Sequence, residues 1–354
     1  LHVTDRFGDI PYSQALQAPD ILAPVFDEQS AVYSGVFNTL SDAVSMMDAG
    51  AGPTGDIMLG GDMAMWAKFA NTMRLVAALR LSNVDPTKGS AEFNAAMAAG
   101  VIATDNSENI TYQHLADANN QNPWYGRFLT RKDYTLANTL VDYMHSTANG
   151  GMMNVAMDPR LPVFGDGTES SGGTEIVGMV YGISEADAGA ISNEDVSFLG
   201  AKLQEQDAPT YIYTAAQVLF SMAEAVELGW ISGDTEQFYN DAIQASLDQY
   251  GVGAGYADYM LNTEVAFDSN RALEQIGNQK WVALFLNGYE GWAEWRRTGY
   301  PALEPAVAAQ NPSGEIPVRQ AYPTWEPDLN GDNYAAVVAR QGEDGLDTKV
   351  WWDQ

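Results

Sequence analysis

Apolar residues recur at three- and four-residue steps along several long stretches of the chain, the spacing of one face of an α-helix. The stretches contain polar residues on the intervening positions, as expected for helices that bury one side. Asp85-Pro86 and Gly229 follow two of them and are typical of helix ends. The pattern predicts helices over residues 28–50, 62–82, 133–146, 209–229, 234–250 and 268–297.

Neighbouring predicted helices are joined by short links, most clearly residues 209–229 and 234–250. Paired helices of this kind are typical of tetratricopeptide-like repeats, although the consensus of about 34 residues is absent. Residues 175–183 (EIVGMVYGI) predict one short strand or hairpin. We therefore expect a mostly α-helical fold with tetratricopeptide-like helix pairs and few short strands.

Between the helices lie long stretches rich in Gly, Pro, Asn, Asp and Ser, such as residues 147–174 and 302–354. Long irregular segments in a compact domain often carry function or pack against its body. We expect a single domain over residues 1–354, with a loop-rich, ligand-binding portion over approximately residues 104–205 and 302–354.

The net charge of the chain limits the classes of molecule that it can bind. The 354 residues include 47 acids and 17 bases, a net charge of −30, while 46% of residues are hydrophobic. Such an acidic surface repels phosphate backbones and disfavours nucleic acids and sulfated polymers. No apolar run reaches the roughly 18 residues that cross a bilayer. We expect a globular protein that binds no nucleic acid.

Candidate catalytic and metal chemistry is sparse. The chain has no cysteine and three histidines that are far apart in sequence, which argues against thiol catalysis and a histidine-rich metal centre. Residues 328–332 (DLNGD) have calcium-like spacing, but Asn333 and Ala339 stand where an EF-hand needs Gly and Glu. We expect no cofactor and no metal, with a different kind of calcium site left as an alternative. No nucleophile, phosphate-loop or zinc-protease motif is present.

The densest cluster of aromatic and charged residues is WVALFLNGYEGWAEWRRTGYP, residues 281–301. On a helix, Trp281, Trp292 and Trp295 fall near one stripe, and Glu294 can pair with Arg297. We expect a buried aromatic face with ion pairs at the helix end, and arginines 74, 80, 296 and 297 as partners of buried acids. A sugar-stacking platform or a catalytic carboxylate pair is the alternative.

This cluster and other segments, in the same order along nearly the whole chain, resemble the SusD/RagB family of surface glycan-binding lipoproteins of Bacteroidetes. The segments are VTDRFGDIPYSQAL (3–16), GGDMAMWAKFANTMRLVAALRLSNVDP (60–86), RKDYTLANTLVDYM (131–144), DPRLPVF (158–164), AEAVELGWI (223–231), QKWVALFLNGYEGWAEWRRTGYPAL (279–303), IPVRQAYPTWE (316–326) and WWD (351–353). The resemblance implies helix pairs as a scaffold and a loop-rich remainder that carries the ligand site.

The resemblance also implies a non-catalytic protein at the outer cell surface that delivers an oligosaccharide to a TonB-dependent, SusC-like outer-membrane transporter. It implies a lipid anchor and further helical sequence before residue 1, neither of which is in this chain. The acidic surface favours a neutral glycan, such as a β-glucan or mannan. A helical-repeat adaptor for peptides and a glycoside hydrolase are the alternatives.

Sugars are held by aromatic rings against their apolar faces and by polar groups that bond their hydroxyls. We therefore searched for aromatic residues in loops, where NNQNPWYGRF (119–128) offers the strongest candidates. The predicted carbohydrate-binding residues are Trp124, Tyr125, Asn122, Arg127, Tyr181, Asp166 and Trp325. For each of them, the alternative is a loop side chain that packs on the body or is merely solvated.

Overall fold

The computed structural model describes residues 1–47, 50, 52–145 and 157–354. Part of the predicted loop-rich portion, residues 146–156, lies outside the described residues. The longer helices are α2 (Gln29–Met46), α3 (Met63–Leu79), α4 (Pro86–Ala99), α9 (Ala215–Glu227), α10 (Thr235–Gln249), α12 (Ala272–Ala283), α13 (Gly288–Thr298) and α15 (Gly331–Gln341). The short ones are α1 (His2–Phe7), α5 (Pro123–Phe128), α6 (Asn138–Met144), α7 (Leu161–Phe164), α8 (Glu185–Gly189), α11 (Tyr256–Tyr259) and α14 (Glu326–Leu329).

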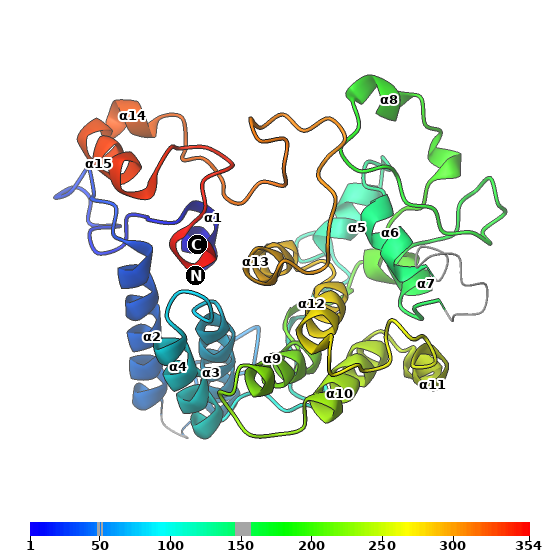
Figure 1. The fold of residues 1–354 in the computed structure, drawn as a ribbon, viewed down its shortest axis with the longest axis horizontal. Helices are drawn as coiled ribbons and strands as arrows, with labels where there is room; N and C mark the ends of the chain where they lie inside the picture. The colour runs from blue at the N-terminus through cyan, green and yellow to red at the C-terminus, as the bar shows by residue number, and fades with distance from the viewer. Residues whose placement is uncertain (48–49, 51, 146–156) are drawn as a thin grey trace.

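Helix pairs form the scaffold, as the sequence predicts. Helix α3 packs against α4, α9 against α10, and α12 against both α9 and α13. Figure 1 shows these pairs side by side in the lower half of the molecule, with α2 at one edge. The strands β1 (Ile110–Tyr112) and β2 (Thr210–Tyr213) pair antiparallel. The architecture is mostly helical, in agreement with the expected fold class.

Side-chain caps explain why several scaffold helices begin where they do. An Asp or Thr oxygen accepts a hydrogen bond from a backbone N–H of the first turn, and each such cap stabilises a helix by about 0.5–2 kcal/mol. At α4 the cap is followed by Pro86, which suits the first helical position because proline lacks an N–H. The capping residues are Asp62, Asp85, Thr214 and Asp234.

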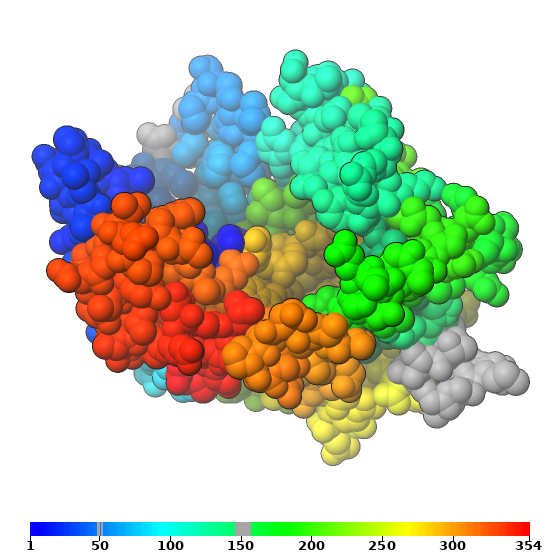
Figure 2. All heavy atoms as spheres, turned by 90° about the horizontal axis from the view of Figure 1, so that it is seen from above, coloured from blue at the N-terminus to red at the C-terminus, as the bar shows by residue number. Residues whose placement is uncertain are grey.

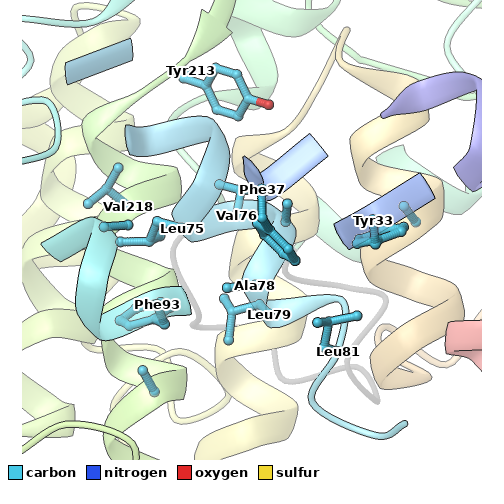
Figure 3. Close-up of a cluster of buried hydrophobic side chains, with 14 of the residues drawn as sticks. Tyr33, Phe37, Leu75, Val76, Ala78, Leu79, Leu81, Phe93, Tyr213 and Val218 are labelled. Carbon is cyan, nitrogen blue, oxygen red and sulfur yellow. The ribbon is translucent and has the colours of Figure 1, made fainter. Parts of the chain in front are cut away.

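The main core lies where α2, α3, α4 and α9 meet (Figure 3). Tyr33, Leu75, Phe93 and Val218 are almost fully enclosed there. Gly89 lets α4 approach its neighbours, because a Cβ at this position would lie 2.7 Å from the Trp230 ring. Close packing of this kind makes the scaffold rigid.

The boundaries of the helices and strands differ from those predicted at several places. The predicted helix 268–297 is two helices, because the chain turns at Leu286, which has a φ of 67°. Residues 210–213 form strand β2, although they were expected in helix 209–229. Residues 175–183 form no named strand, yet their backbone bonds to residues 136–138 and 197. Helices α4, α14 and α15 were not predicted, and the last two lie in a stretch expected to be irregular.

Above the scaffold, the chain forms two separate groups of loops and short helices. Figure 1 places α5, α6, α7 and α8 on one side and α1, α14 and α15 on the other, with α13 between them. Figure 2, which looks down on this arrangement, shows a hollow between the two groups. Residues of the yellow-to-orange part of the colour scale, to which α12 and α13 belong, form its floor.

Candidate carbohydrate-binding site

A buried network of charges fixes α13 at the floor of the hollow. The side chain of Arg80, the residue that follows α3, is fully buried, and its Nη2 lies 2.7 Å from Glu290 Oε2 while its Nη1 pairs with Glu294. Glu294 also pairs with Lys280 Nζ at 3.0 Å and with Arg297 Nη2 at 2.6 Å. Burial alone would raise the pKa of Glu294, but Arg297, Lys280 and Arg80 hold that pKa well below its usual range.

The predicted pairing with buried acids is confirmed for Arg80 and Arg297, whereas the acid that pairs with Arg74 is only half-buried. Arg74 pairs with Glu92 at 2.6 Å, and Arg297 pairs with Glu224 from α9 as well as with Glu294. Arg296 is the exception, since its nitrogens donate to the backbone oxygens of Val318 and Asp5 at 2.9 and 2.8 Å. Burial lowers the pKa of Arg296 to about 10.

The tryptophan face of α13 is more open than predicted. Positions 290, 294 and 297 turn their charged side chains into the body, so Trp292 and Trp295 lie on other faces of the helix and are half-buried. They line an apolar pocket of about 350 Å³. The apolar pocket is lined by Thr135, Leu136, Ala137, Thr139, Leu140, Trp281, Leu284, Phe285, Leu286, Gly288, Gly291, Trp292, Trp295, Leu303 and Ile316.

The expectation of a fully buried aromatic face is therefore wrong in part. Trp292 has a structural contact, because its Nε1 donates to the backbone oxygen of Pro317 at 2.9 Å and its ring stacks on Arg296 at 3.8 Å. Trp281 packs edge-on against Tyr143. Their remaining surface faces the apolar pocket, so these rings both stabilise the fold and line a concave surface.

An exposed cluster of rings lies on the α5 side of the hollow. The Trp124 and Tyr134 rings meet edge to face with centroids 5.4 Å apart. The guanidinium carbon of Arg127 lies 6.0 Å from the Trp124 centroid and 5.2 Å from that of Tyr134. Arg127 Nη1 also donates to the Tyr134 hydroxyl at 2.5 Å. We call Trp124, Arg127 and Tyr134 the ring cluster; Thr135, which follows it, lines the apolar pocket.

The remaining residues of the predicted 122–127 motif have different environments. Asn122 is buried, its Oδ1 accepts from the Trp124 backbone N–H at 2.8 Å, and its Nδ2 donates to the Ala208 oxygen at 2.9 Å. Both ends of this amide are used, so Asn122 positions α5, and its contact with a sugar stays a prediction. Tyr125 is half-buried on the same helix.

The other three predicted residues, Tyr181, Asp166 and Trp325, lie outside the ring cluster. Tyr181 is 47% exposed, and its backbone N–H donates to Asn138 Oδ1 at the start of α6. Asp166 lines a separate pocket of about 490 Å³ and accepts from the Ala201 N–H at 3.0 Å. Trp325 caps α14 on the opposite side of the hollow and is 58% exposed.

Sequence reasoning missed two aromatic residues. Tyr134 sits at the edge of a predicted helix and was treated as part of it, although its ring is 40% exposed. Tyr289 lies between residues of the charge network, and its 46% exposed ring has the Arg6 guanidinium carbon 4.6 Å from its centroid. The shared signal is a Tyr within reach of an Arg that has no carboxylate partner in the described residues, but only the fold brings Arg6 to Tyr289.

Throughout the described ranges, no helix has both the length and the apolar character needed to cross a membrane. Within those same ranges, His, Asp and Glu form no group of three or more that could hold a metal ion. The DLNGD segment instead ends α14 and begins α15, with Asn330 Nδ2 donating to the Pro24 oxygen.

Comparison with known proteins agrees with this arrangement. Residues 1–323 match a SusD-like family described as "Starch-binding associating with outer membrane". A solved chitin-binding SusD homolog from Flavobacterium johnsoniae is 28% identical with a TM-score of 0.83, over 100% of this chain and 78% of that one. A SusD homolog from Bacteroides uniformis is 26% identical with a TM-score of 0.87, over 100% and 78%. No curated protein matches the chain.

The family match spans most of the chain, and the helix pairs superpose on several solved relatives. Both findings agree with the resemblance seen in the sequence motifs. The chain therefore belongs to the SusD-like family, whose members are non-catalytic, carbohydrate-binding proteins associated with the outer membrane.

Proposed function

We propose that the protein holds a neutral polysaccharide in the hollow, at the outer cell surface, and delivers it to a TonB-dependent, SusC-like transporter. The observation that supports this most is the ring cluster. It offers two partly exposed aromatic faces and a guanidinium whose remaining N–H groups can donate to sugar hydroxyls. The apolar pocket beside it can take the less polar face of a further sugar unit.

Local charge supports a neutral ligand. The basic residues next to the ring cluster are already matched, since Arg131 pairs with Asp133 at 3.0 Å and Lys132 with Glu169 at 2.8 Å. Arg127 is the nearby cation that contacts rings and a hydroxyl. Against a net charge of −30, one such cation does not make a site for polyanions.

Affinity electrophoresis tests the site. Gels would contain a soluble β-glucan, a mannan or a soluble chitin derivative, the last because two similar structures are named as chitin-binding proteins. We expect one neutral polymer to retard the wild type and Trp124→Ala to weaken that binding at least tenfold, about 1.4 kcal/mol. Leu129→Ala is the matched control, since Leu129 is a 58% exposed neighbour without a ring. Equal retardation of both variants would remove the ring cluster as the site.

The transporter partner needs a separate test. The full-length protein, with whatever precedes residue 1, would be purified from outer membranes by a tag. We expect a TonB-dependent transporter of SusC type to copurify with it, and the complex to survive addition of the neutral polymer. Purification of the protein alone, at physiological salt and in mild detergent, would contradict the delivery part of the proposal.

A further inference from the structure

A third cavity, of about 320 Å³, lies beside the apolar pocket and shares no lining residue with it. We call it the polar pocket; its lining includes Tyr143, Tyr259, Asn262, Asn278, Gln279 and Tyr300. Tyr143 on its wall meets Trp281 of the apolar pocket edge-on, with ring centroids 6.1 Å apart. These two rings separate the cavities, so the polar pocket needs an explanation of its own.

Two amides in the polar pocket have a side-chain nitrogen that donates to no group in the described residues. Asn278 Oδ1 is enclosed and accepts no hydrogen bond from the described part of the chain. Asn262 is 5% exposed; its Oδ1 accepts from the Glu264 N–H at 2.9 Å, whereas its Nδ2 donates to no group in residues 1–47, 50, 52–145 or 157–354. The Nδ2 atoms of Asn278 and Asn262 bond to no group in the described ranges and keep accessible surface, so two uncharged amide donors are available in the cavity, whereas the enclosed Asn278 Oδ1 is out of reach of a ligand.

The opposite wall is fixed and fully bonded. The Tyr259 hydroxyl donates to Asp158 Oδ2 at 2.8 Å and accepts from Gln279 Nε2 at 2.9 Å. Gln279 Oε1 in turn accepts from Arg160 Nη2 at 2.8 Å, and Arg160 pairs with Asp158 at 2.6 Å. These bonds hold the Tyr259 ring in place, so the cavity is preformed and a ligand would lose little affinity to ordering it.

The charges at the mouth of the cavity are compensated. Arg271 Nη2 lies 2.8 Å from Glu264 and 2.6 Å from Glu274, so neither carboxylate is left without a cation. The groups that remain free are uncharged amides, together with the hydroxyls of Tyr143 and Tyr300, which bond to no group in the described ranges. Neutral donors and acceptors beside flat rings match the hydroxyls and apolar faces of a sugar.

We propose that the polar pocket binds one neutral pyranose unit, at a site independent of the hollow. Its volume is at the lower end of the roughly 300–1,000 Å³ typical of small-molecule sites, which suits a single ring and excludes a long chain. The inference goes beyond the proposed function, because it concerns a free or terminal sugar and does not depend on polymer binding by the ring cluster.

Isothermal titration with free D-glucose, D-mannose and N-acetyl-D-glucosamine tests this site. We expect saturable binding of at least one of them to the wild type, with a stoichiometry of one. Asn278→Leu, which removes the amide at similar volume, should weaken that binding at least tenfold. Tyr300→Phe, which removes only a hydroxyl, should weaken it about threefold and carries the test if Asn278→Leu fails to fold.

Two further variants separate this inference from the proposed function. Trp124→Ala in the ring cluster and Asn38→Leu, on the exposed face of α2, should leave binding of the free sugar unchanged. Absence of saturable binding by all three sugars, or equal binding by wild type, Asn278→Leu and Tyr300→Phe, would mean that the cavity holds only water. Loss of sugar binding in Trp124→Ala would place the sugar in the hollow instead. Polymer retention that fails while free-sugar binding persists would overturn only the proposed function.

Discussion

Arg80 in the scaffold and Arg127 in the ring cluster show how burial decides what an arginine does. Arg80 is fully enclosed, and both of its terminal nitrogens are taken by the carboxylates of Glu290 and Glu294. Arg127 is exposed, contacts two rings and a hydroxyl, and pairs with no carboxylate in the described residues. A desolvated guanidinium needs a carboxylate to be tolerated, whereas a solvated one keeps donors free for a ligand. Burial therefore commits the charge of Arg80 to stability, whereas the exposed Arg127 keeps donors free.

The largest effect should come from removing the buried cation. We expect Arg80→Met to lower the free energy of unfolding by about 3–5 kcal/mol, because among the described residues Glu290 then keeps only Gln217 Nε2 at 3.3 Å and His2 Nδ1 at 3.8 Å beside it. Urea denaturation monitored by circular dichroism measures this loss.

The double variant Arg80→Met/Glu290→Gln provides the control, since it removes the stranded charge and keeps its shape. It should regain a large part of the lost stability, and the two single changes should therefore not add. A loss below about 1 kcal/mol in Arg80→Met would show that the network is not what holds α3 against α13.

Variants at the tryptophans of the apolar pocket test whether the residues that stabilise the fold and the residues that bind the glycan are separate sets. We expect Trp292→Ala to cost about 2 kcal/mol of stability, less than the roughly 3–5 for a fully buried Trp, because the ring is half-buried. Trp124→Ala should cost less than about 1 kcal/mol but lose polymer retention. Thermal unfolding and affinity gels on both variants separate the two quantities.

The opposite pattern of retention would place the glycan-binding site elsewhere. If folded Trp292→Ala loses retention while Trp124→Ala keeps it, the apolar pocket holds the glycan and the ring cluster is a surface feature. If both lose it, the sugar spans from the wall of the hollow to its floor.

The fold was more predictable than the site. Periodic apolar residues located most scaffold helices, because burial of one face imposes a repeat of 3.6 residues whatever the neighbours are. The periodic pattern did not predict the turn at Leu286, because the apolar positions continue at helical spacing across it. Helix α4 escaped it because its long stretch of small residues gives a weak pattern, although Asp85-Pro86 is also a strong start signal.

The site depends on contacts between distant segments, which a pattern cannot reveal. Trp124 and Arg127 were foreseen as loop residues, but Asn122 was not foreseen as a cap, although Asn122-Pro123 is a local helix-start signal. The burial of Asn122 depends on the distant Ala208 oxygen, which no local pattern indicates. The tryptophans of α13 were assigned to the core since their spacing is that of an apolar face. Instead, the buried acids Glu290 and Glu294 occupy the inner face of the helix, and the periodicity of the sequence does not indicate this.

Asp353 is a buried acid whose charge is compensated only in part. Burial raises its pKa to about 6 from the usual 3.8, with Lys349 and Arg296 offsetting this only in part. The folded protein therefore holds a proton that the unfolded chain releases near pH 4, and stability falls as pH rises from about 4 to 6. We expect Asp353→Asn to remove this fall and to be more stable at pH 7 by about 1–2 kcal/mol, after allowance for solvent screening.

Unfolding curves at pH 4, 5, 6 and 7 for the wild type and Asp353→Asn measure the difference. The two proteins should be similar near pH 4 and diverge up to pH 6, beyond which the difference should stay constant. A difference that is already complete at pH 4 would mean that the lost carboxylate had acted through its hydrogen bonds and not through its charge.

The smallest stability effect should come from Arg127, which makes the comparison with Arg80 complete. We expect Arg127→Ala to change the free energy of unfolding by no more than about 0.5 kcal/mol, since exposed cations contribute little to stability. It should nevertheless weaken polymer retention, because it removes both the donors and the support of the Trp124 and Tyr134 rings. Arg127→Lys separates these contributions, since an ammonium keeps the charge but cannot bond with the planar geometry of a guanidinium. If Arg127→Lys binds as weakly as Arg127→Ala, geometry and not charge is what the glycan requires; a loss of stability as large as that of Arg80→Met would contradict the contrast between the two arginines.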